Sequence, residues 1–347
     1  MARWKVDVTL HVYQHLIGRS AKLQRVLWSW MIVAIASGLC SCSDGDNPVK
    51  PSRAFYVLDL PWDISPDGRS VLYATSGTDL YPRGIYSVDT SGTSAPLPVI
   101  ELDSAIPFPT GLRYSPSGDR LAFQRGLEIW VRRLSDDAES QVTSTGQNAT
   151  DPDWSPDGNS IVYVRPFRSA GAMDTTAGLF ILDLASSIER PLTHGGKATF
   201  GSTPRWSTDG SSIVFTYGSP GHIFLVTVDG SVYRDLTLGA STDNLDPAWD
   251  VSGANVIYEA FNASDRQRHE TRIVGKDGAG DSRYSSQLRP YGLRSAISRD
   301  GMMAAYDSVT ASTDTLVLYV KGISIPKLPP RRLTVTRAPE VALDSSP

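Results

Sequence analysis

The chain has little of what several protein classes require. Its 347 residues include only 2 Cys and 5 His, and its formal net charge is -4. Two cysteines cannot form the disulfide framework of a small secreted domain, and a slightly acidic chain has no basic surface for nucleic acid phosphates. With 40% hydrophobic and 20% charged residues, collagen-like and disordered classes are excluded as well. We therefore expect an ordinary folded protein whose partners do not include nucleic acid.

The chain also lacks an apolar run long enough to span a bilayer comfortably. Val26 to Leu39 is a mostly apolar stretch of 14 residues, whereas a spanning helix needs about 20. Arg19, Lys22 and Arg25 precede this stretch, and small residues follow it. Positive charges, a short apolar segment and small residues are typical of a secretory signal peptide, which we place at residues 1–41.

The residues after the apolar stretch indicate how the chain is held in the cell. Leu39-Cys40-Ser41-Cys42 resembles the bacterial lipobox, although Cys40 stands where a small residue is usual. The resemblance implies that Cys42 is lipidated and becomes the mature N-terminus, followed by a flexible tether over residues 42–53. In that family an Asp after the cysteine retains the protein at the inner membrane. Ser43 stands there, which favours the periplasmic side of the outer membrane. The alternative is an ordinary signal peptide with two incidental cysteines.

The rest of the chain repeats one short unit. Six turn-forming tetrapeptides align on a glycine, with spacings of 50, 40, 52, 43 and 48 residues. A period of this length indicates a repeat architecture. The aligned glycines are Gly68, Gly118, Gly158, Gly210, Gly253 and Gly301.

The residues around each glycine repeat as well. Four residues before it stands a large apolar residue, three residues after it an apolar one, and five residues after it an aromatic one. The last two positions share one face of a strand, because side chains alternate along a strand with a period of two. We therefore expect each unit to be a hairpin whose aromatic residue is buried. The aromatic residues are Tyr73, Phe123, Tyr163, Phe215, Tyr258 and Tyr306.

Two further strands follow each hairpin, and no convincing amphipathic helix occurs after residue 41. The third strands are predicted at residues 84–89, 127–133, 178–184, 222–228, 271–274 and 315–320. Fourth, shorter strands end in Val142-Thr143, Leu192-Thr193, Leu236-Thr237 and Leu333-Thr334. This pattern predicts an all-β fold, a six-bladed β-propeller of four-stranded antiparallel blades over residues 54–336, with a C-terminal tail at 337–347. Either 54–60 or 332–336 could supply the strand that closes the ring.

The repeats resemble those of a known family. Pro152-Asp153-Trp154-Ser155-Pro156-Asp157-Gly158 and Pro204-Arg205-Trp206-Ser207-Thr208-Asp209-Gly210 are similar to the WD-like propeller repeat of TolB and its relatives. The resemblance implies a non-catalytic, lipid-anchored propeller of the bacterial cell envelope that binds another envelope protein. TolB also has an α/β domain before its propeller, and the residues between Cys42 and Phe55 are too few for one.

The sequence offers little sign of catalysis. It contains no Gly-x-Ser-x-Gly elbow of the kind that hydrolases use. His194, His222 and His269 fall in three different repeats at dissimilar positions, so we expect no metal site and no cofactor. We therefore expect that the chain is not an enzyme. The alternative is a carbohydrate-binding or metal-assisted hydrolase or lyase propeller that takes a small ligand in its central channel.

A partner protein is expected to bind where the longest loops emerge. These are the loops from second to third strands and those before first strands, which share one end of a propeller. Arginine and aromatic side chains in such loops are typical of interfaces. The candidate partner-binding residues are Arg165, Phe167, Arg168, Arg205, Arg266 and Arg268.

Overall fold

The structure is a computed structural model of the whole chain. It describes residues 60–333 except 76–81, 92–93, 103–106, 145, 147, 167–176, 194–202, 263–268, 286–294, 299–302, 310–315 and 323–330. The chain divides into two compact units, Met1–Ala54 and Phe55–Pro347, and every described residue belongs to the second. The predicted signal peptide, Cys42, the tether and the C-terminal tail lie outside the described residues.

The described residues form six four-stranded antiparallel sheets, each built from consecutive strands. The first strands are β1 (Leu60–Ile64), β5 (Thr110–Tyr114), β9 (Thr150–Trp154), β13 (Arg205–Trp206), β17 (Asp243–Trp249) and β21 (Ser295–Ile297). The second strands are β2 (Ser70–Thr75), β6 (Arg120–Arg125), β10 (Ser160–Pro166), β14 (Ser212–Tyr217), β18 (Asn255–Phe261) and β22 (Met303–Val309). The third strands are β3 (Gly84–Asp89), β7 (Glu128–Arg133), β11 (Ala177–Asp183), β15 (His222–Thr227), β19 (His269–Gly275) and β23 (Leu316–Gly322). The fourth strands are β4 (Leu97–Glu101), β8 (Glu139–Gln141), β12 (Glu189–Pro191), β16 (Tyr233–Asp235), β20 (Ser282–Ser285) and β24 (Arg331–Leu333).

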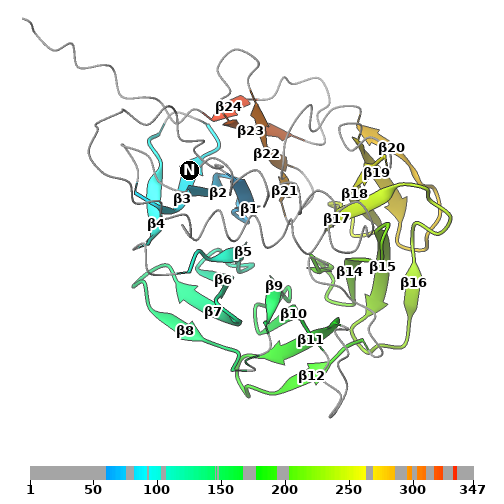
Figure 1. Cartoon of the computed structure of the whole chain (residues 1–347), viewed down its shortest axis with the longest axis horizontal. Coiled ribbons are helices and arrows are strands. Elements are labelled where there is room, and N and C mark those ends of the chain that lie inside the picture. The colour runs from blue at the N-terminus through cyan, green and yellow to red at the C-terminus, as the bar shows by residue number, and fades with distance from the viewer. Residues whose placement is uncertain are drawn as a thin grey trace, which may run out of the picture. The chain divides into compact units, whose positions relative to one another are not determined.

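The six sheets are the blades of a propeller, which confirms the predicted fold class. The blades follow one another around a ring with their first strands innermost (Figure 1). The ring closes where β1 packs against β21 and β22 of the sixth blade. We predicted that residues 54–60 or 332–336 would supply the strand that closes the ring, and residues 54–59 and 334–336 lie outside the described part of the chain. β24 is the fourth strand of its own blade, and β1 to β4 form a sheet by themselves.

The hairpin turns after the first strands follow from local hydrogen bonds. In the third blade the Ser155 hydroxyl oxygen accepts a hydrogen bond from the N–H of Ser160 at 2.9 Å, and the N–H of Gly158 donates to the Ser155 carbonyl at 3.0 Å. Gly158 has φ of +70°, which side chains strongly disfavour. The same turn joins the first and second strands at Gly68, Gly118 and Gly210. In the turn that contains Gly253, Asp250 takes the role of the serine.

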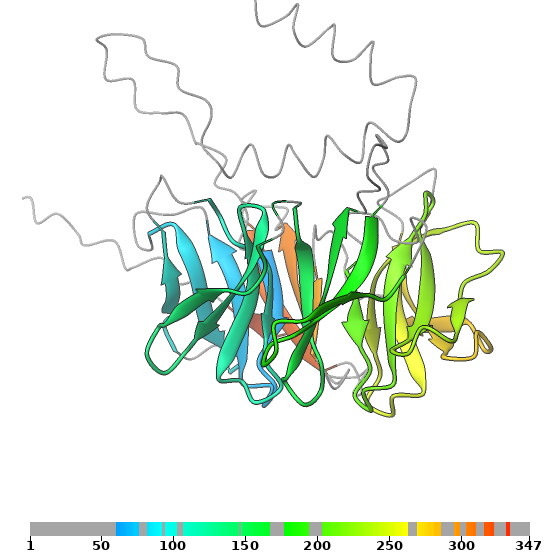
Figure 2. The ribbon, with the colours of Figure 1, turned by 90° about the horizontal axis from the view of Figure 1, so that it is seen from below.

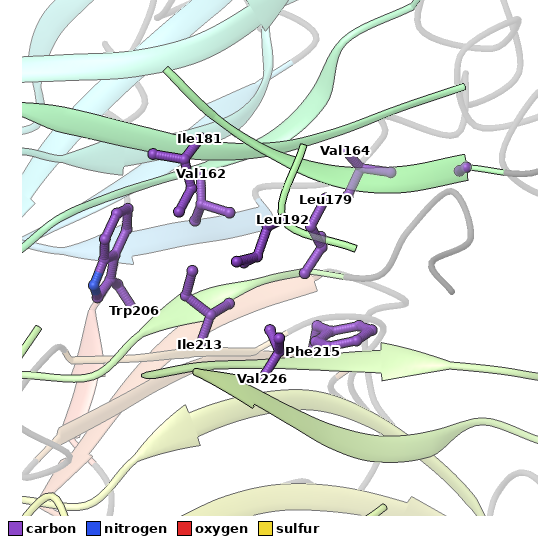
Figure 3. Close-up of a cluster of buried hydrophobic side chains, with 10 residues drawn as sticks. Val162, Val164, Leu179, Ile181, Leu192, Trp206, Ile213, Phe215 and Val226 are labelled. Carbon is purple, nitrogen blue, oxygen red and sulfur yellow. The ribbon is translucent and has the colours of Figure 1, made fainter. Parts of the chain in front are cut away.

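The predicted aromatic residues are buried between neighbouring blades. Five of the six are at most 1% exposed, and the side chain of Tyr306 lies outside the described part of the chain. Between the third and fourth blades, Phe215 packs in a cluster with Leu179, Trp206 and Val226 (Figure 3). Because the seams between the first five blades bury apolar side chains from two sheets each, these seams supply much of the hydrophobic stabilisation.

In three blades, a threonine that follows the fourth strand makes a hydrogen bond to the third strand. The Thr193 hydroxyl oxygen accepts a hydrogen bond from the N–H of Leu179 at 3.0 Å. Thr143 and Thr237 do the same for Ile129 and Ile223. In these three blades the strand itself ends before the predicted pair, at Gln141, Pro191 and Asp235.

The strands of all blades run between the same two ends of the ring (Figure 2). Because the strands of a blade are antiparallel, the turns after the first strands emerge at one end. We call this the turn end. The connections from second to third strands, and those that lead into first strands, emerge at the opposite end, which we call the loop end.

Candidate ligand site in the central channel

One position recurs on every first strand, and four of its residues, Asp63, Asp153, Arg205 and Ala248, line the centre of the ring. It is the residue directly before the large apolar residue that ends the strand, and it has the same register against the second strand in every blade. The pairs are Asp63 with Leu72, Arg113 with Ala122, Asp153 with Val162, Arg205 with Val214, Ala248 with Ile257, and Ala296 with Ala305. Around the ring this position therefore carries Asp, Arg, Asp, Arg, Ala and Ala.

The two aspartates at this position connect neighbouring blades. Asp63 Oδ2 accepts a hydrogen bond from the N–H of Tyr114 in the second blade at 2.8 Å, and Asp63 Oδ1 accepts one from its own neighbour Ile64 at 3.0 Å. Asp153 Oδ2 accepts a hydrogen bond from the N–H of Trp206 in the fourth blade at 2.7 Å. Each carboxylate thus stabilises the end of the next first strand.

Where arginine occupies the position, a tryptophan makes the connection. Trp154 Nε1 donates to the Arg113 carbonyl at 3.2 Å, and Trp249 Nε1 donates to the Arg205 carbonyl at 3.1 Å. The four seams from the first to the fifth blade are therefore linked alternately by a carboxylate and by an indole. The arginine side chains take no part in these links.

The charged groups of the channel influence one another. Burial raises the pKa of Asp63, and the negative charge of Asp153 raises it further. The nearby Arg113 and Arg205 and the hydrogen bond from Tyr114 oppose that rise. Arg205 Nη1 lies 3.9 Å from Asp153 Oδ1. The four charges are thus close enough to form one electrostatic unit.

Asp63, Asp153 and Arg205 line a hollow to which all six blades contribute. The space between the lining residues is partly open to solvent, and its enclosed part is small, with room for about two or three water molecules. Its lining includes Pro66 of a first-strand turn, so the hollow lies toward the turn end. The lining residues are Asp63, Ile64, Pro66, Tyr114, Asp153, Arg205, Trp206, Ala248, Trp249 and Ser298.

The described residues offer no metal centre. Among them, no group of three or more His, Cys, Asp or Glu side chains could hold a metal ion. His222 Nδ1 lies 3.0 Å from Asp235 Oδ2, away from the channel lining. His194 and the side chain of His269 lie outside the described part of the chain. None of the described residues forms a helix of the length and apolar character needed to cross a membrane.

The structure separates the residues that the sequence grouped as a partner-binding face. Arg165 is paired with Glu189 and lies over the ring of Phe180 at 3.7 Å, in the outer part of the third blade. Arg205 lies in the channel hollow toward the turn end, because it directly precedes the last residue of its strand. Phe167, Arg168, Arg266 and Arg268 lie outside the described residues.

The sequence contains a signal for the channel site in the charged residues near the ends of the first strands. Asp63, Arg113, Asp153 and Arg205 precede the last large residue of their strands and alternate in charge from repeat to repeat. Of these four, Arg205 was predicted at the loop end, among the partner-binding residues. It lies in the hollow toward the turn end instead.

The fold defines a class of protein, a β-propeller of four-stranded antiparallel blades, and the hollow lies in its central channel. No protein family model matches the chain. A stretch of 134 residues is 27% identical to the uncharacterized peptidase YuxL of Bacillus subtilis and covers 35% of this chain and 20% of that protein. Another of 112 residues is 34% identical to the uncharacterized protein Atu1656 of Agrobacterium fabrum and covers 32% of this chain and 35% of that protein. The chain thus spans about a third or less of these relatives.

Solved structures of similar fold include TolB proteins. A TolB-type protein of Agrobacterium tumefaciens matches with a TM-score of 0.54 at 21% identity, covering 66% of this chain and 80% of that one. TolB of Acinetobacter baumannii matches with a TM-score of 0.55 at 16% identity, covering 76% and 60%. An oligogalacturonate lyase in complex with manganese matches with a TM-score of 0.54 at 16% identity, covering 78% and 75%. The chain therefore has the TolB-like propeller fold that its repeats predicted.

These comparisons contradict the prediction that the chain is not an enzyme. That prediction depended on kinship with TolB and on the lack of recognisable catalytic motifs. The same propeller fold is equally similar to an oligogalacturonate lyase, and part of the sequence is similar to a peptidase. One fold can carry many functions, so the TolB-like fold does not exclude catalysis.

Proposed function

We propose that the protein is a propeller that binds a saccharide in the turn end of its central channel. The observation that carries this proposal is the hollow lined by all six blades, in which charged groups lie beside tryptophans. Carboxylates and guanidinium groups can hydrogen-bond sugar hydroxyls, and aromatic edges offer apolar contact. The fold shared with an oligogalacturonate lyase supports the same ligand class.

A binding experiment tests this function. The full chain is titrated by calorimetry with neutral, acidic and amino oligosaccharides, and we expect at least one class to bind. Turnover is followed in parallel through new reducing ends and through the double bond that a lyase creates, with and without added Mn²⁺. The absence of binding by every class would overturn the proposal.

A matched pair of variants tests whether the ligand occupies the channel. Ala248 lines the hollow, so Ala248→Met fills it with a flexible side chain. Ala279→Met makes the same change at an exposed position. We expect the first variant to bind the saccharide about tenfold or more weakly and the second to bind like the wild type. Equal binding by both would place the ligand elsewhere.

We also propose that the protein is attached to the bacterial cell envelope through a lipid on Cys42, on the periplasmic side of the outer membrane. The lipobox-like residues and the similarity to TolB proteins support this location. Cells are labelled with a radioactive fatty acid, and wild type is compared with Cys42→Ala and Cys40→Ala. Label should be lost only in the Cys42 variant. Label that persists there would overturn the lipid site.

A second candidate function is the capture of another envelope protein at the loop end, which the TolB-like fold favours. The residues proposed for this contact are Arg165, Phe167, Arg168, Arg266 and Arg268. Replacing residues 167–176 and 263–268 by short Gly-Ser connections should abolish co-purification of the partner from membranes, while thermal unfolding of the ring stays unchanged. If the shortened variant captures the partner as well as the wild type does, the partner does not bind at the loop end.

A further inference from the structure

The two arginines of the channel have different neighbours around the ring. Arg113 lies between blades that carry Asp63 and Asp153 at the equivalent position. Arg205 has Asp153 on one side, but on the other side the fifth blade carries Ala248. The blade that follows Arg205 thus has no carboxylate at the equivalent position.

The two guanidinium groups also differ in their hydrogen bonds. Arg113 Nη1 donates to the carbonyl of Leu112 at 3.0 Å. Within the described residues, no hydrogen bond from the Arg205 guanidinium is found, because Asp153 Oδ1 at 3.9 Å is beyond hydrogen-bond distance. The Arg205 side chain is 15% exposed, so its donors can be reached from the hollow.

The carboxylates of Asp63 and Asp153 accept hydrogen bonds, whereas the Arg205 guanidinium donates none among the described residues. Both oxygens of Asp63 accept backbone hydrogen bonds, and Asp153 Oδ2 accepts one from Trp206. A cationic ligand would have to compete with these donors and with Arg205 itself. An anionic ligand would meet the Arg205 guanidinium, which makes no hydrogen bond among the described residues and whose ion pair with Asp153 spans 3.9 Å.

The hollow has room beside Arg205 on the side of the fifth blade. Ala248 and Trp249 line it there. At this position the first four blades carry a charged side chain, whereas Ala248 has only a methyl group. A guanidinium matches the two oxygens of a carboxylate with two parallel N–H donors. The enclosed part of the hollow has room for a group the size of a carboxylate, and the rest of the ligand would lie in the part that is open to solvent.

We propose that the ligand of the channel is an acidic saccharide whose carboxylate binds Arg205 from the side of Ala248. This inference rests on the proposed function, since it specifies the ligand of the same site. Arg205 is then the residue that determines specificity for acidic over neutral sugars. Ala248 keeps the place of the carboxylate open.

The test uses the full chain and three disaccharide probes: digalacturonate, its dimethyl ester and diglucosamine. Wild type should bind digalacturonate at least tenfold more tightly than the ester. Arg205→Ala should weaken digalacturonate binding by about 10-fold to 100-fold, since it removes a charge-assisted pair, and should leave binding of the ester within about twofold. Arg234→Ala, on the outermost strand of the same blade and exposed, is the matched control and should change neither.

A second pair of variants keeps Arg205 and changes only its neighbour. Ala248→Asp places a carboxylate where the ligand's carboxylate would lie, and should weaken digalacturonate binding at least tenfold. Ala248→Asn has the same size without the charge and should retain more of the binding. Thermal unfolding of each variant confirms that the ring is folded.

The outcomes separate this inference from the proposed function. If wild type binds the ester or diglucosamine as tightly as digalacturonate, the channel still binds saccharides but the acidic specificity is overturned. Equal losses for acid and ester in Arg205→Ala, or equal effects of Asp and Asn at position 248, overturn the role of Arg205. If no saccharide binds, both the proposed function and this inference fail.

Discussion

The carboxylate of Asp153 accepts a hydrogen bond from the backbone N–H of Trp206 across the seam between the third and fourth blades, at 2.7 Å. Asp63 makes the equivalent bond to Tyr114 two blades earlier. Both aspartates are nearly fully buried. A charged acceptor in such a place stabilises the ring only while its donor is present, because either group left alone would be buried without a partner.

Asp153→Ala should therefore destabilise the propeller. The variant leaves the Trp206 N–H without an acceptor and Arg205 without its nearby carboxylate, so we expect a loss of about 1–3 kcal/mol in the free energy of unfolding. Urea denaturation measures it. Asp136→Ala is the control, because Asp136 is half exposed and pairs with Arg133 on the surface, where such pairs contribute at most about 1 kcal/mol. Equal losses in the two variants would contradict the role of the seam bond.

Thr193→Val should also lower the free energy of unfolding. The Thr193 hydroxyl, 3% exposed, accepts a hydrogen bond from the N–H of Leu179, and valine has the same shape without the oxygen. We expect a loss of about 1–2 kcal/mol. Thr193→Ser keeps the hydroxyl and should lose less than the valine variant. If serine proves the more harmful, the methyl group and not the hydrogen bond attaches the fourth strand.

Acid should weaken the hairpin turns. Hydrogen bonds from the Thr227 hydroxyl and from the N–H and hydroxyl of Ser231 lower the pKa of Asp229 from 3.8 to about 2. Because the folded pKa lies below the unfolded one, the contribution of Asp229 is present above about pH 4 and is lost as the pH falls toward 2. Asp229→Asn removes this titration.

Urea denaturation at several pH values measures the effect. Between pH 5 and pH 2 the free energy of unfolding should fall less steeply in Asp229→Asn than in wild type. Asp137→Asn is the control, because Asp137 is exposed in another turn. A slope in Asp229→Asn as steep as in wild type would contradict the assignment.

Glu259→Gln should stabilise the protein. Glu259 is 1% exposed, and its Oε1 accepts a hydrogen bond from the Thr271 hydroxyl at 3.1 Å, whereas its Oε2 has no hydrogen-bond partner among the described residues. A buried charge with an unpaired oxygen is costly. We expect a gain of about 1 kcal/mol at neutral pH by urea denaturation.

Glu128→Gln, the matched substitution, should lower the free energy of unfolding. Both carboxylate oxygens of Glu128 are engaged, one by the Thr143 hydroxyl and one by the N–H of Gly146. Glu128→Gln replaces one of these acceptors with a donor, so the variant should lose stability. Destabilisation by Glu259→Gln as well would show that the Glu259 charge has a function in the native ring.

The sequence predicted the blades well because their determinants are local. In the first four blades the serine hydroxyl of the first-strand turn accepts a hydrogen bond from an N–H five residues later. The third strand at Gly84–Asp89 was predicted to the residue. The fourth strands were placed too far along the chain, because the threonine that follows each one bonds through its side chain and not as part of the strand.

The site was predicted less well. Reasoning from loop length put Arg165 and Arg205 on one face, yet Arg165 pairs with Glu189 in the outer part of its blade and Arg205 lies in the channel. Fold kinship also led to the wrong expectation that the chain is not an enzyme. Neither loop length nor kinship reports which side chains meet at the centre of the ring.

The amino-acid sequence alone determined the period of the repeat, the turns and the alternation of buried and exposed positions, since each depends on residues close together in the chain. Only the tertiary structure decided that Asp63, Asp153 and Arg205, up to 142 residues apart in the chain, line one hollow. It also decided that Arg205 faces an alanine on one side. Which side chains from different blades lie close together depends on how far each blade is rotated relative to the next. That rotation is set by packing across the seams.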